Sequence, residues 1–313
     1  MFTHTFDECT GVDTVEARGE KLVIRRRGAE VIGLAMDHRD HGRVGLIWRD
    51  GEVEDPASGW RNHATILFPV VGGLHGHCSR TTDGTEVRFR GLHGLARHAT
   101  FALARVEGRA YGVDLEYVLD ADDETRAAYP FDFRLSVTYG LRRGRLEQAI
   151  TAQNRGDRPM PFQVGWHPGF NTPFVNGEKR DCHLRLPAGR VRRLFNDPDC
   201  RLTGESVDLD TRGDFRFTDA ELDATYMLDI SASPPERRVV ELLDPDESIG
   251  VRVHLPDYPH LGLWSDTGAP FICIEPWQGM DDHVVQEPFD RKFGIRLLDP
   301  GASEQRRASI EML

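Results

Sequence analysis

Regular alternation of apolar and polar residues is the feature that most constrains the fold of this chain. The clearest run lies in residues 111–119, where the apolar positions are Tyr111, Val113, Leu115, Tyr117 and Leu119. A strand turns successive side chains to opposite faces, so this period of two predicts a strand with one buried face. Residues 131–141 alternate in the same way, and a third run occupies residues 146–152. The segment 142–145, Arg-Arg-Gly-Arg, predicts a hairpin turn between the second and third runs.

The rest of the chain continues the strand pattern. Further strands are predicted at residues 21–25, 31–36, 87–90, 225–230, 239–243, 249–255, 271–275 and 303–311. No amphipathic helix longer than two turns is indicated, and the 31 glycines and 18 prolines are spread through the whole sequence. Many short strands separated by such turn residues favour an all-β fold, a large antiparallel β-sandwich or barrel. Because no shift in composition marks a boundary, we expect one domain over residues 1–313.

The net charge of the chain argues against two classes of binding partner. The 313 residues include 39 Lys and Arg against 51 Asp and Glu, a formal net charge of −12. Such a charge repels phosphate backbones and anionic lipids, so neither nucleic acid nor a membrane surface is expected as a partner. The longest apolar stretches, residues 66–71 and 271–274, are far shorter than the ~20 residues that span a bilayer.

The N-terminal residues and the cysteines indicate a cytoplasmic protein. The chain begins without the basic region and apolar core of a signal peptide. Its five cysteines are odd in number and widely spaced, with no C-x-x-C pair. Neither a disulfide framework nor a thiolate zinc site fits this pattern.

Three segments gather His, Glu and Trp beside Gly and Pro, where turns at strand ends present side chains to a ligand. They are residues 92–97, residues 165–170 and residues 271–279. In the last, alternation puts Glu275 on the same face as Phe271 and Cys273, at the end of an apolar strand. A carboxylate there is either desolvated or held by a partner, and both situations perturb its pKa. The alternative is that Glu275 turns outward before Pro276.

The histidines of the other two segments are candidates for proton transfer and ligand binding. His167 lies between Trp166 and Pro168. An indole offers a flat face to a sugar or another ring, and an ordinary histidine gives or takes a proton near neutral pH. The alternative is a histidine that only hydrogen-bonds within its loop. His93 precedes Gly94, so it either donates a hydrogen bond to a ligand as a neutral ring or caps a turn.

A second group of histidines has two interpretations, a metal site or a polar loop. His75 and His77 form an H-x-H pair, with His63 upstream, and a strand would place both rings on one face, as metal ligands require. No further ligand at helical spacing completes the set, so we expect a polar loop at a pocket rim and no metal. The sequence contains no P-loop, no G-x-G-x-x-G in a strand-to-helix context and no G-x-S-x-G elbow, which removes support for nucleotide cofactors and serine hydrolysis.

An ordered set of motifs over roughly residues 20–312 resembles the aldose 1-epimerases, or galactose mutarotases, and within them the shorter bacterial relatives of the lactose-operon type. The matching segments are Trp60, residues 66–72, 93–97, 129–133, 154–162, 166–170, 258–264 and 268–277. The resemblance implies a galactose mutarotase-like β-supersandwich, which agrees with the strand pattern. It implies an isomerase that interconverts the α and β anomers of a free aldohexose such as glucose or galactose without a cofactor.

The resemblance also implies roles for individual residues. Glu275 is similar to the general base of the family and His167 to the general acid, which enters the reaction protonated. The implied substrate-binding residues are His93, Arg97, Asp223, Trp277 and Phe170.

Two features leave the substrate open. Gly73 stands where close relatives carry Arg, so the contact made there is altered. Arg97 matches a motif shared with the hexose-6-phosphate 1-epimerases, which makes a sugar phosphate the second candidate substrate. A third possibility is a carbohydrate-binding protein that performs no reaction.

Overall fold

Alternating segments of the sequence form antiparallel strands in the computed structural model, which describes residues 1–48, 60–215 and 217–313. The largest sheet has eight strands, in the order β15 (His183–Arg185), β19 (Val239–Leu243), β20 (Gly250–His254), β24 (Ser303–Met312), β12 (Arg145–Asn154), β11 (Phe133–Arg142), β10 (Gly112–Asp120) and β9 (Ala102–Arg109). The predicted hairpin is confirmed, because β11 and β12 pair directly up to Arg142 and Arg145.

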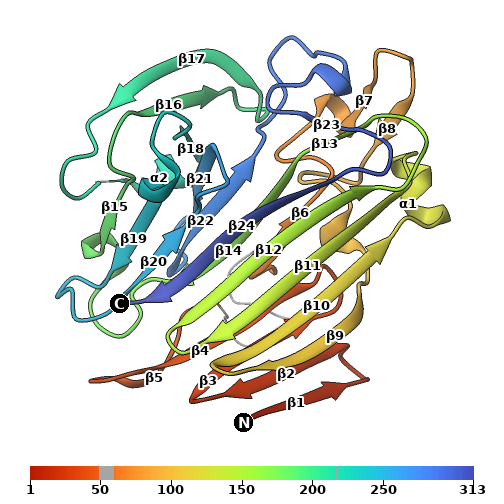
Figure 1. The fold of residues 1–313 in the computed structure, drawn as a ribbon. Coiled ribbons are helices and arrows are strands. Elements are labelled where there is room, and N and C mark those ends of the chain that lie inside the picture. Colours follow the sequence, from red (N-terminus) through yellow and green to blue (C-terminus); the bar gives the residue numbers. More distant parts are fainter. Residues whose placement is uncertain (49–59, 216) are drawn as a thin grey trace.

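A second sheet of seven strands carries the segments in which His167 and Glu275 lie. Its order is β17 (Leu202–Leu209), β16 (Val191–Asn196), β18 (Tyr226–Asp229), β21 (His260–Trp264), β22 (Phe271–Gln278), β14 (Val164–Asn171) and β6 (Ala64–Leu67). In Figure 1 the eight-stranded sheet passes in front of β6 and β14.

Smaller sheets and short helices complete the described residues. The N-terminal sheet runs β1 (Phe2–Asp7), β2 (Val12–Ala17), β3 (Glu20–Arg25), β4 (Glu30–His38) and β5 (Gly42–Gly45), and lies along the lower edge of Figure 1. Two-stranded pairs join β13 (Met160–Phe162) to β23 (Arg296–Leu298) and β7 (Cys78–Arg80) to β8 (Glu86–Arg88). The helices are α1 (Asp123–Ala128), α2 (Asp219–Asp223) and the 3₁₀ turns η1 (His75–His77), η2 (Ala96–His98), η3 (Lys179–Asp181), η4 (Pro235–Arg237) and η5 (Phe289–Arg291).

One large hydrophobic core joins the three larger sheets. It includes Leu34 from β4, Val137 from β11 and Ile274 from β22, all nearly inaccessible to solvent. The buried hydroxyl of Tyr139 donates a hydrogen bond to the carbonyl oxygen of Ala29 at 2.7 Å, which ties the N-terminal segment to β11. This packing of antiparallel sheets confirms the predicted all-β sandwich.

The predicted strand ends differ by a few residues from those observed. Strand β18 begins at Tyr226 because Thr225 has a φ of +59°, which is incompatible with a strand. Strand β8 ends at Arg88 rather than at residue 90. Among the described residues, no helix has the length and apolar character needed to cross a membrane.

Candidate functional site

Strand pairing brings His167 and Glu275 together although 108 residues separate them in sequence. Strands β14 and β22 pair with Gly165 opposite Trp277 and Gly169 opposite Cys273. This register puts His167 opposite Glu275, and directly opposed residues share one face of a sheet. The other face of the same strands carries Trp166, Phe170 and the isoleucines of β22, which pack into the main core.

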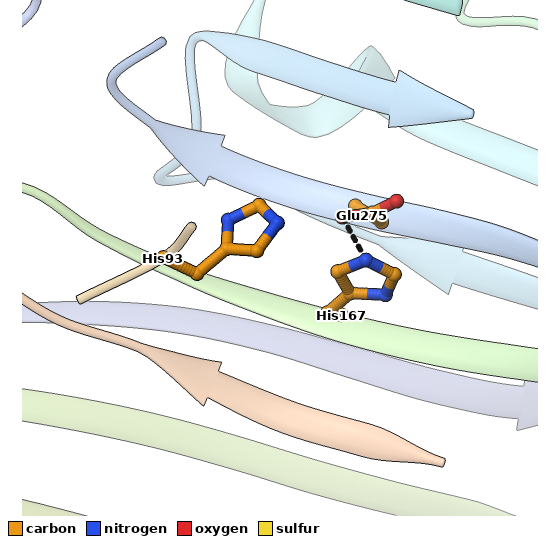
Figure 2. Close-up of side chains that lie close together, drawn as sticks. All are labelled: His93, His167 and Glu275. Carbon is orange, nitrogen blue, oxygen red and sulfur yellow. Dashed lines mark ion pairs between the residues drawn. The ribbon is translucent and has the colours of Figure 1, made fainter. Parts of the chain in front are cut away.

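The two side chains make a direct contact. The Nε2 atom of His167 lies 3.1 Å from Oε2 of Glu275, and both side chains are buried (Figure 2). The indole N–H of Trp277 donates a hydrogen bond to the same oxygen at 3.1 Å. Within the described part of the chain, Oε1 of Glu275 and Nδ1 of His167 have no hydrogen-bond partner. The pair therefore keeps polar atoms that a bound molecule can satisfy.

His93 reaches the same place from a loop. Its φ is +68°, and its Nδ1 accepts a hydrogen bond from the backbone N–H of Gly72 at 3.1 Å. This bond requires an unprotonated Nδ1, so the ring proton lies on Nε2. The rings of His93 and His167 meet edge to face with 5.4 Å between centroids. Glycine is needed at Gly94, with φ +75°, because a Cβ there would lie 2.4 Å from the Phe68 carbonyl oxygen.

Burial favours the uncharged form of each of these three groups. It lowers the pKa of His93 well below its usual value, and the nearby His167 and Arg97 act in the same direction. It lowers the pKa of His167 to about 3, again with help from the charge of Arg97. It raises the pKa of Glu275 well above its usual range, despite the opposing effects of the Trp277 hydrogen bond and Arg97. Both shifts favour a neutral His167 and a protonated Glu275, whereas the resemblance implied a protonated His167.

These residues line a cavity of about 300 Å³. Its lining residues are Trp60, Gly72, Leu92, His93, Arg97, His167, Asn196, Cys200, Asp223, Thr225, Trp264, Glu275, Trp277 and Asp281. The ring centroids of Trp60 and Trp264 lie 5.3 Å and 5.9 Å from that of His167. A cavity with flat aromatic walls and converging polar atoms is typical of a small-molecule site.

Six of the seven site residues predicted from the sequence line this cavity, and Phe170 does not. Phe170 is fully buried in the main core. Alternation along β14 explains the difference, because His167 and Phe170 are three residues apart and point to opposite faces. Trp166 lies on the same core face, where its indole N–H donates to the Ala64 carbonyl oxygen at 3.2 Å, so it offers no face to a ligand.

Arg97 and Asp223 occupy different parts of the wall. Arg97 lies on η2, where the charges of Glu30 and Glu275 act on it, and its Nε atom has no hydrogen-bond partner among the described residues. Asp223 is the last residue of α2 and is exposed. The wall therefore combines a largely buried cation with a carboxylate open to solvent.

The second histidine group does not belong to the cavity. The ring of His75 bonds through Nε2 to the carbonyl oxygen of His283 at 2.7 Å, and neither His75 nor His77 lines the cavity. In the described part of the chain, the donor atoms close enough to share a metal ion are those of His93, His167 and Glu275, which lie within 4.8 Å of one another.

Several lining residues were not predicted. Trp60 and Trp264 belong to the motifs that carry the resemblance, but no role was assigned to them. Asp281 follows Glu275 by six residues and lies beyond the end of β22. The path of the chain after this strand brings it to the cavity wall. No sequence signal marks Asn196, Cys200 or Thr225.

Comparisons with known proteins agree with this geometry. The sequence profile of the Aldose 1-epimerase family matches residues 15–311. Protein LacX of Lactococcus lactis subsp. lactis is 28% identical over 282 residues, which cover 87% of this chain and 90% of that protein.

Solved structures show the same fold. A galactose mutarotase related enzyme from Lactobacillus acidophilus has a TM-score of 0.84 at 28% identity, covering 96% of this chain and 97% of that one. A galactose mutarotase-like protein from Lactobacillus casei has a TM-score of 0.81 at 27% identity, covering 97% of this chain and all of the other. The chain therefore belongs to the aldose 1-epimerase family, and it is an isomerase of mutarotase type.

Proposed function

We propose that this protein interconverts the α and β anomers of a free aldohexose such as glucose or galactose. The observation that carries the proposal is the buried contact between His167 and Glu275 in the wall of a cavity of about 300 Å³. Anomer exchange needs one group that accepts a proton and one that donates a proton at the same pH. A pair that holds a single proton between two atoms 3.1 Å apart supplies both.

The reaction then consists of proton transfers. Glu275, as carboxylate, removes the proton of the anomeric hydroxyl while His167 donates its proton to the ring oxygen, and the ring opens to the aldehyde. Rotation about the C1–C2 bond presents the other face of the carbonyl, and the reverse transfers close the ring. Before the ring opens, the proton moves from Glu275 to His167, which leaves the total charge of the pair unchanged. The bound sugar favours this transfer, because it donates a hydrogen bond to Glu275 and accepts one from His167.

The remaining residues bind the sugar. His93 is a neutral ring whose Nε2 donates a hydrogen bond to a sugar oxygen, since its Nδ1 is occupied by Gly72. Arg97 and Asp223 bind hydroxyl groups, and the indole of Trp277 both orients Glu275 and contacts the sugar ring. No electrons are transferred and no oxygen needs a metal to polarise it, so the proposed reaction requires no cofactor.

The charges of the cavity favour a free sugar over a sugar phosphate. Among the lining residues described, Arg97 is the one side chain with a permanent positive charge. The same lining includes the carboxyl groups of Asp223 and Asp281, besides that of Glu275, which favours its uncharged form. A phosphate would meet more repulsion than attraction there, since dedicated phosphate sites offer several cationic or N–H donors.

We also propose that the protein is cytoplasmic, is one domain, and has neither nucleic acid nor membrane among its partners. All five cysteines are free thiols, which is typical of a reducing compartment. The net charge of −12 disfavours binding to anionic polymers and surfaces.

Anomer conversion by the purified protein tests the proposed reaction. Polarimetry starts from pure α-glucose and α-galactose, and a β-specific coupled assay follows glucose 6-phosphate. Acceleration with a free sugar supports the proposal, and activity confined to the phosphate would transfer the assignment to a hexose-phosphate epimerase. Sugar binding without acceleration of any of the three would indicate a binding protein instead.

A further inference from the structure

Gly73, which carries no side chain, lies next to three residues of the cavity wall. A Cβ atom there would lie 3.1 Å from Leu92 Cδ2, 3.6 Å from Asp281 Oδ1 and 3.8 Å from the Cys200 carbonyl oxygen. All three of these residues line the cavity. The backbone of Gly73 does not lie in the positive-φ region, so its conformation does not demand glycine. A side chain at Gly73 would therefore lie against the carboxyl group of Asp281, and its absence leaves that contact unmade.

Asp281 is held in place but only half satisfied. Its Oδ1 atom accepts a hydrogen bond from the backbone N–H of Gly73 at 2.6 Å. Its Oδ2 atom accepts none from the residues that the structure describes, and it is not one of the fully enclosed polar atoms that lack a partner. Because Asp281 lines the cavity and keeps 5% of its surface exposed, we infer that this free oxygen is open to the cavity. A ligand that donates a hydrogen bond at this position would supply the partner that the protein does not.

The nearby cation is engaged elsewhere. The ammonium group of Lys292 lies 3.6 Å from Oδ1 of Asp282 and donates to the Met280 carbonyl oxygen. Asp281 thus faces one positive charge, Lys292, and two negative ones, Asp282 and Asp197. Burial and the two carboxylates raise the pKa of Asp281 to about 6, so it is largely ionised at pH 7.5. Arg97 faces Glu30 and Glu275 instead.

We propose that Asp281 is a specificity-determining residue that hydrogen-bonds the sugar beside Gly73 and prefers a protonated amine there to a hydroxyl group. The preferred substrates are then amino-deoxy aldoses with the amine at the position that lies against Oδ2. A hydrogen bond between two charged groups is roughly twice as strong as one between neutral groups. This inference rests on the proposed sugar site and names the substrate class that the site selects.

The test compares the wild-type protein with Asp281→Asn at pH 7.5. Asparagine keeps an oxygen that accepts the Gly73 N–H and removes only the charge. Anomer conversion is measured by NMR for glucose and its 2-, 3- and 6-amino-deoxy analogues. Binding of the corresponding methyl glycosides, which cannot open their rings, is measured by calorimetry. Asp223→Asn is the matched control, because it removes one carboxylate from another part of the same wall.

We expect at least one amino sugar to exceed glucose about tenfold in kcat/KM, and Asp281→Asn to reduce that ratio to about one. Asp223→Asn should leave the ratio unchanged, whatever its effect on the individual rates. If Asp281→Asn does not fold, Gly73→Arg replaces it, since a guanidinium beside Asp281 should abolish the preference equally.

The outcomes separate this inference from the proposed reaction. Conversion of glucose without preference for any amino analogue, or a preference that survives Asp281→Asn, would overturn the role of Asp281 and leave the reaction standing. An Asp281-dependent preference among the methyl glycosides without conversion of any sugar would overturn the reaction alone. Failure of every methyl glycoside to bind would overturn the role of Asp281 as well.

Discussion

The chemistry of this protein depends on a few buried side chains whose charge is set by their surroundings. His167 and Glu275 are ordinary titratable residues in sequence, but burial changes the protonation that each prefers. The sequence allowed us to name both residues. The resemblance implied that His167 holds the proton, but the location of the proton depends on burial and on the charge of Arg97, neither of which a motif records.

A direct prediction concerns the titration of His167. Because its pKa is lowered to about 3, its ring should stay neutral from pH 8 down to pH 5. NMR of labelled histidine side chains would measure this, with His183 as an internal control. The hydrogen bond of His183 with Asp214 raises its pKa, so His183 should titrate at a higher pH than an unperturbed histidine. Protonation of His167 near pH 6.5 would contradict the account.

The different positions of Phe170 and Trp277 lead to a second prediction. Phe170→Leu should lower the free energy of unfolding by about 1–3 kcal/mol, because it opens space in the core, and should leave KM unchanged. Trp277→Phe should instead lower kcat by about tenfold or more, because Glu275 loses a hydrogen bond. Denaturant unfolding and anomer-conversion kinetics on both variants measure the two effects. A changed KM in Phe170→Leu would place that residue in the site after all.

Strands position the site, and their pairing could not be read from the sequence. Alternation predicted 11 of the 24 strands of the described residues to within a few residues, including β10, β11, β12 and β24. It did not predict β14, the strand that carries His167. The register of β14 against β22 brings His167 to Glu275, and it depends on contacts between residues far apart in the chain. The position of Asp281 depends in the same way on the path of the chain after β22.

Close packing between β21 and β22 provides a test at this level. A Cβ atom at Gly262 would lie 2.7 Å from Cζ2 of Trp277, so Gly262→Ala should displace the indole that orients Glu275. We expect a loss of about 1–3 kcal/mol in the free energy of unfolding and about a tenfold loss in kcat. Gly91→Ala is the control, since nothing lies within 4 Å of its added Cβ and its φ is not positive. Equal effects of the two substitutions on kcat would argue against this role of Trp277.

At the scale of the whole molecule, the sandwich fold holds the cavity, and the net charge affects which substrates approach it. The fold class follows from the sequence because the period of two pervades the chain, and the charge follows from composition alone. The cavity wall also contains more carboxyl groups than permanently cationic side chains. The composition of the chain does not predict where these groups lie.

This excess leads to a prediction about ionic strength. A molecule with net charge −12, and with Asp223 and Asp281 in its cavity wall, should repel glucose 6-phosphate. Any kcat/KM for this phosphate should therefore rise as salt screens the repulsion, while kcat/KM for glucose should stay constant. Steady-state assays between low and moderate salt measure both. A fall with salt for the phosphate would instead reveal an attractive, basic site.

The central claim is that His167 and Glu275 exchange protons with the sugar, and the rate of anomer conversion in His167→Gln and Glu275→Gln tests it most directly. Polarimetry with α-glucose or α-galactose, whichever the wild type converts faster, gives the rates, and calorimetry with the methyl glycoside shows that binding survives. The account predicts a loss of ~10²–10⁴ in kcat for each variant with the affinity for the methyl glycoside little changed. Near wild-type turnover in either variant would contradict it.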